Sequence, residues 1–185
     1  MSTLEDVLHW DRLSLNLSDA QAVQAFRAGM ASLPPGLPRA VAQWRLEDRT
    51  VLAALRRRHL GRPAPAPGEL WGCGRLLERI QRAWTEPVFG LERHLPWVAE
   101  AARLLAAGDS PGLERLLLGH TWDGLGRQGA GHYFDFEAVA IYVLKWDILR
   151  RWSGYNGVAA LRRFMELSDA GLDGRQALFA PLQGV

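Results

Sequence analysis

Residues that could do chemistry occur in this chain, but their spacing matches no known catalytic pattern. The glycine-rich stretch 124–131 reads Gly-Leu-Gly-Arg-Gln-Gly-Ala-Gly, and such a backbone can wrap an anion at the start of a helix. However, the lysine and serine or threonine of a phosphate-binding loop are missing, and no strand is expected before the glycines. Asp135 and Glu137 would also repel a phosphate. The pattern therefore predicts a flexible connector.

The histidines and the cysteine give no metal-binding or nucleophilic pattern. The histidines lie on separate predicted segments, without a pair at the i, i+4 or short-loop spacing of a usual site: His9, His59, His94, His120 and His132. Cys73 is the only cysteine, which excludes an internal disulfide and fits a reducing compartment. No histidine can be placed beside its thiol. We expect no metal and no cofactor.

The sequence gives equally little evidence for catalysis by a serine or by a pair of carboxylates. No serine lies in Gly-x-Ser-x-Gly, the turn of one large hydrolase class. Asp109 and Glu114 are close in sequence, but exposed carboxylates on a helix are more simply solvated surface than an acid–base pair. An enzyme is the weaker hypothesis, and we expect no catalytic residues.

A cluster of arginines and a large number of tryptophans are more than a small helical protein needs for its fold. Arg56, Arg57 and Arg58 end a predicted helix, where cations are favourable by themselves, so a solvated helix end explains them. The alternative is a docking surface for an acidic partner. Arginine and tryptophan also dominate protein–protein hot spots, and the chain has eight tryptophans. The predicted partner contacts are Trp44, Arg45, Arg49, Arg56, Arg57 and Arg58.

Length and composition predict one globular domain. The chain has 185 residues, of which 48% are hydrophobic, enough for one sizeable core. Its net charge is +2, with acidic and basic residues interspersed, so a nucleic-acid partner is not indicated. No window reaches the roughly 18 to 20 apolar residues that a membrane span needs, and no leader pattern opens the chain. We expect a cytoplasmic protein without direct membrane insertion.

The longest apolar stretch predicts a central helix over 135–153. Asp135 can cap its start, Phe134 and Val139 have the spacing of a hydrophobic staple, and Gly154 suits its end. At 100° per residue its apolar residues form two stripes, which predicts a helix packed on two sides. The residues expected in the core are Phe134, Phe136, Tyr142, Trp146, Leu149 and Trp152.

Helical periodicity and caps predict the other elements. The chain begins with an N-terminal arm, 1–33, and a Pro-rich connector at 61–68 follows the predicted helix 39–60. No stretch alternates apolar and polar residues strictly, so no sheet is expected. The fold class is all-α, a single-domain bundle (1–185) of about six to seven helices around the buried helix 135–153. The remaining helices are predicted at about 4–10, 18–33, 39–60, 75–84, 96–107, 110–125 and 156–167.

Two stretches carry a family resemblance. The stretch 44–61 reads Trp-Arg-Leu-Glu-Asp-Arg-Thr-Val-Leu-Ala-Ala-Leu-Arg-Arg-Arg-His-Leu-Gly, and 134–152 reads Phe-Asp-Phe-Glu-Ala-Val-Ala-Ile-Tyr-Val-Leu-Lys-Trp-Asp-Ile-Leu-Arg-Arg-Trp. They resemble two helical signatures of the C-type rotor component of A/V-type ATPases, which is called the d-type component in eukaryotic V-ATPases. The second is more similar still to small, poorly characterised bacterial proteins associated with V-type ATPase genes. The resemblance covers 44–61 and 96 to about 167.

The resemblance implies a non-catalytic coupling component. It would sit at the cytoplasmic junction of the central stalk and the membrane ring of a V/A-type ATPase, peripheral to the membrane, with the other ATPase subunits as partners. Arg56 to Arg58 would then meet acidic loops of the ring or the stalk. The alternative is a soluble helical adaptor or regulator, including one associated with nucleic acid.

Overall fold

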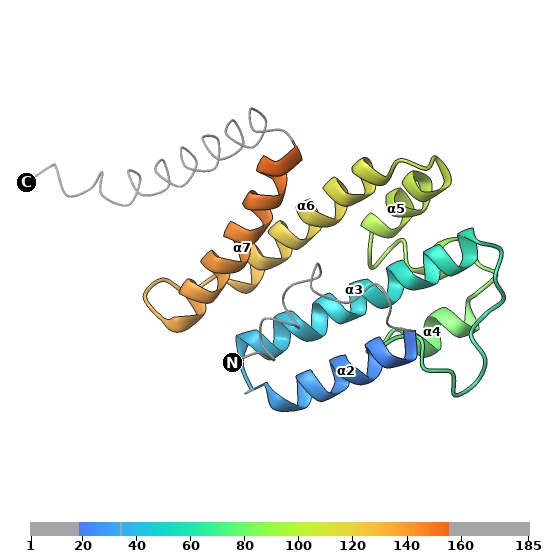
Figure 1. The fold of residues 1–185 in the computed structure, drawn as a ribbon, viewed down its shortest axis with the longest axis horizontal. Coiled ribbons are helices and arrows are strands. Elements are labelled where there is room, and N and C mark those ends of the chain that lie inside the picture. The colour runs from blue at the N-terminus through green and yellow to red at the C-terminus, as the bar shows by residue number, and fades with distance from the viewer. Residues whose placement is uncertain (1–18, 34, 156–185) are drawn as a thin grey trace, which may run out of the picture. The chain divides into compact units, whose positions relative to one another are not determined.

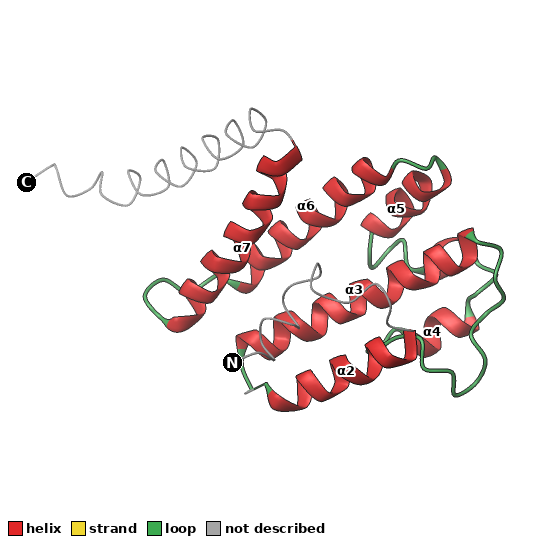
Figure 2. Cartoon of the chain, in the orientation of Figure 1, coloured by secondary structure: helices red, strands yellow, loops and turns green. Residues whose placement is uncertain are grey.

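The computed structural model describes residues 19–33 and 35–155. Within these ranges the chain has six α-helices, one short 3-10 helix and no strand, which confirms the predicted all-α class (Figures 1 and 2). The elements are α2 (Asp19–Ser32), α3 (Leu37–His59), α4 (Leu77–Arg82), η2 (Pro87–Gly90), α5 (Trp97–Ala106), α6 (Ser110–Gln128) and α7 (Phe136–Tyr155). The helices predicted at 4–10 and 156–167 lie outside the described residues.

The chain divides into two compact units, 1–141 and 142–185. Helix α7 begins in the first unit and ends in the second. The Pro-rich connector 61–68 lies inside the first unit. The single domain 1–185 stays a prediction.

Helix α3 is the element on which the first unit is built. It lies between α2 and α6 and runs antiparallel to both (Figure 1). Val41, Val51 and Ala54 are completely buried. The C-terminal half of α3 joins the main hydrophobic cluster, whose buried members are Val51, Leu52, Ala54, Leu55, Trp71, Ile80, Phe89, Leu91, Trp97, Val98, Ala101, Leu104 and Leu113.

Glycines end the predicted helices where the sequence indicates. Gly61 follows α3 with φ +67°, and Gly108 follows α5 with φ +68°, in the left-handed region that glycine adopts without a side-chain clash. The amide of Gly61 donates to the carbonyl of Arg58 (2.9 Å) and that of Gly108 to the carbonyl of Leu105 (3.1 Å). The short link after Gly108 makes α5 and α6 the predicted helical hairpin.

The prediction that α7 is a helix buried on both sides is wrong. Four residues predicted in the core are exposed: Phe134 fully, Phe136 at 70%, Tyr142 at 69% and Trp146 at 56%. Leu149 and Trp152 are half-buried. One stripe of the helix is buried at Ile141 and Ile148, whereas the other meets solvent. The pattern of two apolar stripes was real, but the main hydrophobic cluster forms around α3 and α5 instead.

The glycine-rich stretch 124–131 is not a loop throughout. Helix α6 continues to Gln128, and only the last glycines belong to the connection to α7. The ring of Trp44 packs where a side chain on Gly124 would stand, so close approach between α3 and α6 explains this glycine. Gly154 does not stop α7 either, since the helix runs to Tyr155.

The predicted cap at the start of α7 is confirmed: Asp135 Oδ1 accepts from the amide of Ala138 at 2.9 Å.

Candidate functional site

Two of the three clustered arginines are used inside the chain. Arg57 pairs with Glu69, and its Nε donates to the carbonyl of Pro63 at 2.9 Å. The hydrogen bond from Arg57 lowers the pKa of Glu69. These contacts hold the Pro-rich connector against the end of α3. The predicted acidic docking partner for Arg57 is thus partly supplied by the chain itself.

Arg58 holds the end of α3 to the segment around η2. Its guanidinium lies over the ring of Phe89, 4.3 Å from the centroid, and donates to the carbonyls of Glu86 (2.7 Å) and Trp84 (3.3 Å). Burial lowers the pKa of Arg58. Arg56, by contrast, is exposed, so it is the member of the cluster most available to a partner.

Replacing Arg58 by alanine should therefore destabilise the protein. Two carbonyl groups and the face of Phe89 would lose the cation, and we expect the free energy of unfolding to fall by about 1 to 3 kcal/mol. Arg56→Ala is the matched control, with a change within about 0.5 kcal/mol. Urea unfolding of both variants measures the difference. Equal effects would show that the contacts of Arg58 contribute nothing.

The other predicted contact residues also lie against their own chain. The guanidinium of Arg49 lies over the ring of Phe26, 4.8 Å from its centroid. The ring of Trp44 meets His120 edge-on, with centroids 5.6 Å apart, and Arg45 is half-buried. Trp44 and Arg49 therefore join α3 to α6 and α2. That use within the fold is sufficient to explain both residue types.

An acid–base pair joins α3 and α6, with Asp48 buried and His120 half-buried. His120 Nε2 and Asp48 Oδ2 are 3.0 Å apart, and the imidazole contacts the rings of Trp44 and Trp97. Burial raises the pKa of Asp48, and the hydrogen bond from His120 opposes this in part. In the described part of the chain no hydroxyl or thiol hydrogen-bonds to the imidazole. The pair joins the two helices.

The raised pKa of Asp48 has a consequence for stability. Because the folded protein binds this proton more tightly than the unfolded chain, the contribution of Asp48 to stability is present at acid pH and is lost as pH rises through the folded pKa. Asp48→Asn keeps an oxygen acceptor and removes the buried charge. We expect the variant to be at least as stable as the natural protein at pH 7, with the advantage shrinking below the folded pKa. Denaturant unfolding across that range checks this, and an advantage that grows on acidification would contradict it.

Glu47 and Thr50 pin a loop to α3. Glu47 Oε2 lies 3.2 Å from Arg75 Nε, and the hydroxyl oxygen of Thr50 accepts from the amide of Cys73 at 2.9 Å. Burial raises the pKa of the Cys73 thiol, the opposite of what a reactive cysteine needs. Helical spacing alone predicts that the polar residues of this helix are exposed. Their burial comes from tertiary contacts that the spacing does not reveal.

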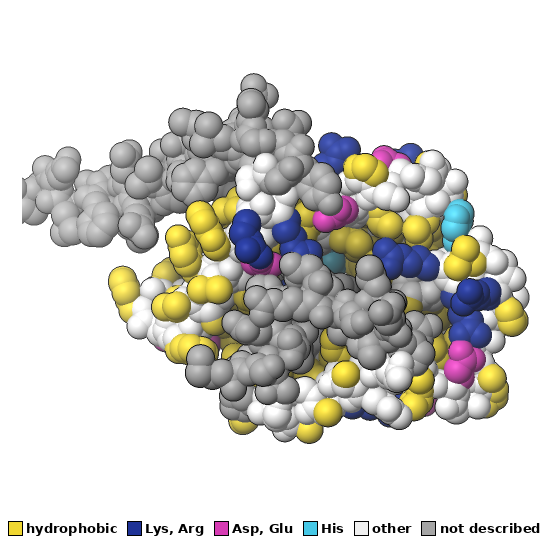
Figure 3. Space-filling model, in the orientation of Figure 1, with side chains coloured by type: hydrophobic (Ala, Val, Ile, Leu, Met, Phe, Trp, Pro, Cys, Tyr) yellow, Lys and Arg dark blue, Asp and Glu magenta, His cyan; other side chains and the backbone are white. Residues whose placement is uncertain are grey.

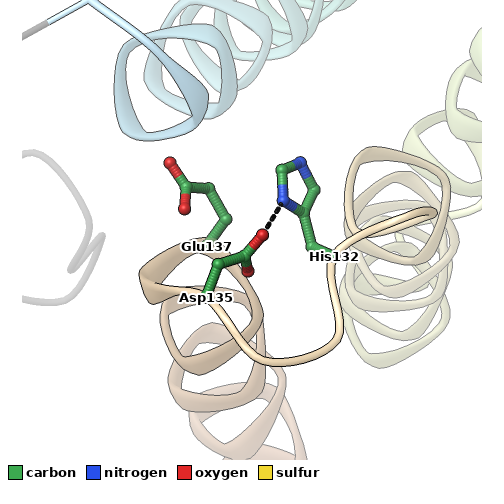
Figure 4. Close-up of side chains that lie close together, drawn as sticks. All are labelled: His132, Asp135 and Glu137. Carbon is green, nitrogen blue, oxygen red and sulfur yellow. Dashed lines mark hydrogen bonds and ion pairs between the residues drawn. The ribbon is translucent and has the colours of Figure 1, made fainter.

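One cluster that was not predicted from the sequence lies at the start of α7 and in the turn before it: His132, Asp135 and Glu137 (Figure 4). Their potential ligand atoms lie within 4.8 Å of one another, and a histidine with two carboxylates suits a divalent metal ion. The sequence feature that could have predicted this cluster is the spacing His-x-x-Asp-x-Glu. It contains one histidine, so a search for pairs of histidines does not find it. Both oxygens of Asp135 are already used, one by His132 Nδ1 (2.6 Å) and one by the cap of α7.

The same hydrogen bonds explain the cluster without a metal. The bond from His132 and that from the Ala138 amide lower the pKa of Asp135, as expected for a capping carboxylate. The start of α7 is the positive end of the helix dipole, which favours anions over cations. The cluster thus fixes the turn that leads into α7.

The exposed large hydrophobic residues of the described part of the chain concentrate in α7 and the turn before it. Of eight large hydrophobic residues that are exposed, seven lie within 133–146: Tyr133, Phe134, Phe136, Val139, Tyr142, Val143 and Trp146. Hydrophobic side chains gather on the surface over α7 in Figure 3. The eighth, Leu60, is isolated at the end of α3. Contiguous exposed apolar patches mark interaction surfaces. Residues 133–146 are therefore the candidate functional site.

Comparison of the chain with protein-family models, with curated proteins and with solved structures gives no match. Among the described helices, none combines the length and the apolar character required to cross a bilayer.

Proposed function

We propose that the protein is a non-catalytic structural component that docks onto a larger assembly through residues 133–146. The observation that carries this proposal is the concentration of exposed aromatic and β-branched residues in that stretch. Each aromatic side chain brings a large apolar area, and covering apolar area stabilises a complex by roughly 25 cal/mol per Å² before the costs of association. A helix face of this kind is a common protein docking element.

The assembly that we propose is a V/A-type ATPase. The resemblance of 44–61 and 134–152 to the C-type rotor components supports this, and 134–152 includes most of the exposed stretch. In this role the protein would act in the cytoplasm, at the junction of the central stalk and the membrane ring, without entering the bilayer. Arg56, the exposed arginine of its cluster, would add an electrostatic contact to an acidic loop.

The proposal predicts which substitutions abolish capture of partners. Tagged protein carrying Val139→Glu and Trp146→Glu should recover at least tenfold less of the ATPase stalk and ring from detergent-solubilised membranes than the natural protein does. Both replaced side chains are exposed, so a carboxylate there should leave the fold intact while opposing apolar burial. Mass spectrometry of the recovered proteins gives the measurement.

Leu60→Glu is the matched control, because Leu60 is an exposed hydrophobic residue outside the stretch. It should leave capture unchanged, and circular dichroism should show that all variants are folded. Recovery of unrelated soluble proteins or of nucleic acid in place of the ATPase would refute the ATPase role and favour the helical adaptor. Recovery that the substitutions in α7 do not change would refute the docking surface.

A further inference from the structure

We propose that in the free protein the exposed face of α7 is covered by α7 of a second copy of the chain, with the two helices antiparallel. This inference rests on the proposed role of that face as an interaction surface. The second copy would cover the apolar residues until the assembly replaces it.

The face has the geometry of a helix-pairing seam. The seam consists of five residues at alternating spacings of three and four, which is the heptad pattern of paired helices. They are Phe136, Val139, Val143, Trp146 and Arg150. The first four are exposed hydrophobic residues, and they form one continuous stripe because α7 is unbroken over them. The buried residues Ile141 and Ile148 lie on the opposite side, at 100° per residue. Thus the helix has one side buried and the seam free.

Charges along the seam favour an antiparallel partner. Its first end carries Asp135 and Glu137, which together contribute −2. The C-terminal end of the seam carries Arg150 and Arg151, which pair with Asp147, so these three residues together contribute +1. An antiparallel second copy brings the acidic end of each helix to the basic end of the other, and it also opposes the two helix dipoles favourably.

A parallel pair would be opposed by the same residues. It would place Arg150 of one copy against Arg150 of the other within the seam, with like charges in contact. With Val143 opposite Trp146 of the second copy, the antiparallel pair instead sets Arg150 opposite Val139, close to the acidic end. The pattern of α7 is thus self-complementary in one orientation only.

Sedimentation equilibrium of the full chain over a range of concentrations tests the pairing. We expect the mean mass to rise from 20.6 kDa toward twice that value, and Val143→Glu to weaken the association at least tenfold. Leu60→Glu should leave it unchanged. A protein that stays monomeric at every concentration would overturn the inference. So would a loss of thermal stability of the monomer in Val143→Glu, because the face would then be covered within its own chain.

Disulfide cross-linking tests the orientation. In a Cys73→Ser background, Val139→Cys mixed with Arg150→Cys should give an oxidised dimer between the two variants, whereas Val139→Cys alone should give little. Dimers of Val139→Cys alone would indicate a parallel pair and overturn the inference. Failure of the inference and of the proposed function are distinguishable: a monomer that still captures the ATPase through α7 refutes only the pairing, and a dimer that captures nothing refutes only the docking.

Discussion

Phe89→Ala should lower the free energy of unfolding by about 3 to 5 kcal/mol, whereas Phe136→Ala should change it by less than about 1 kcal/mol. The two substitutions remove the same side chain from two places. Phe89 is completely buried, with its ring 5.3 Å from that of Trp84 and under the guanidinium of Arg58. Phe136 is 70% exposed. The removed atoms leave a cavity only at Phe89.

This pair of variants decides where the core lies. Helical spacing placed Phe136 in the core and did not single out Phe89, so the sequence pattern and the structure predict opposite orders of stability. Denaturant unfolding of both variants, with circular dichroism to confirm helix content, gives the measurement. If Phe136→Ala lowered the free energy of unfolding more than Phe89→Ala does, α7 would be the buried central helix that the sequence predicts, and it would have no exposed apolar face.

The contrast shows which features the sequence could predict. Helix ends depend on local chemistry, and three of the residues predicted at such ends are confirmed: Asp135 caps α7, and Gly61 and Gly108 end α3 and α5. Gly154 does not end α7, because the helix runs to Tyr155. Helical spacing also identified both apolar stripes of α7. Spacing reports which residues share a face, but it does not report whether another element of the chain covers that face. For this reason Phe136 and Trp146 were placed in the core.

Tertiary contacts account for the other differences. Asp48 and Glu47 are charged residues on an amphipathic helix, and their burial depends on His120, which is 72 residues away from Asp48, and on Arg75. Arg57 and Arg58 belong to a basic cluster in the sequence. In the structure Arg57 pairs with Glu69, and Arg58 donates to a backbone carbonyl just before η2. Phe89 lies in a short 3-10 helix at φ +59°, a conformation that no periodic pattern predicts for phenylalanine.

Gly124→Ala should destabilise the protein by about 1 to 3 kcal/mol, although alanine is the better helix former. A Cβ atom at this position would overlap Cη2 of Trp44, so the indole would have to move. That movement would disturb the contact of Trp44 with His120 and, through it, the pair with Asp48. The clash therefore outweighs the gain in helix propensity, which is about 1 kcal/mol.

Gly119→Ala is the matched control in the same helix. No atom lies within 4 Å of a Cβ there, so this substitution should stabilise the protein by up to about 1 kcal/mol. The two glycine variants thus have opposite expected signs. Adding Trp44→Leu to Gly124→Ala removes the clashing ring, and the double variant should lose less stability than the sum of the single losses. If Gly124→Ala stabilised α6 as Gly119→Ala does, the packing of Trp44 on this glycine would contribute nothing to the fold.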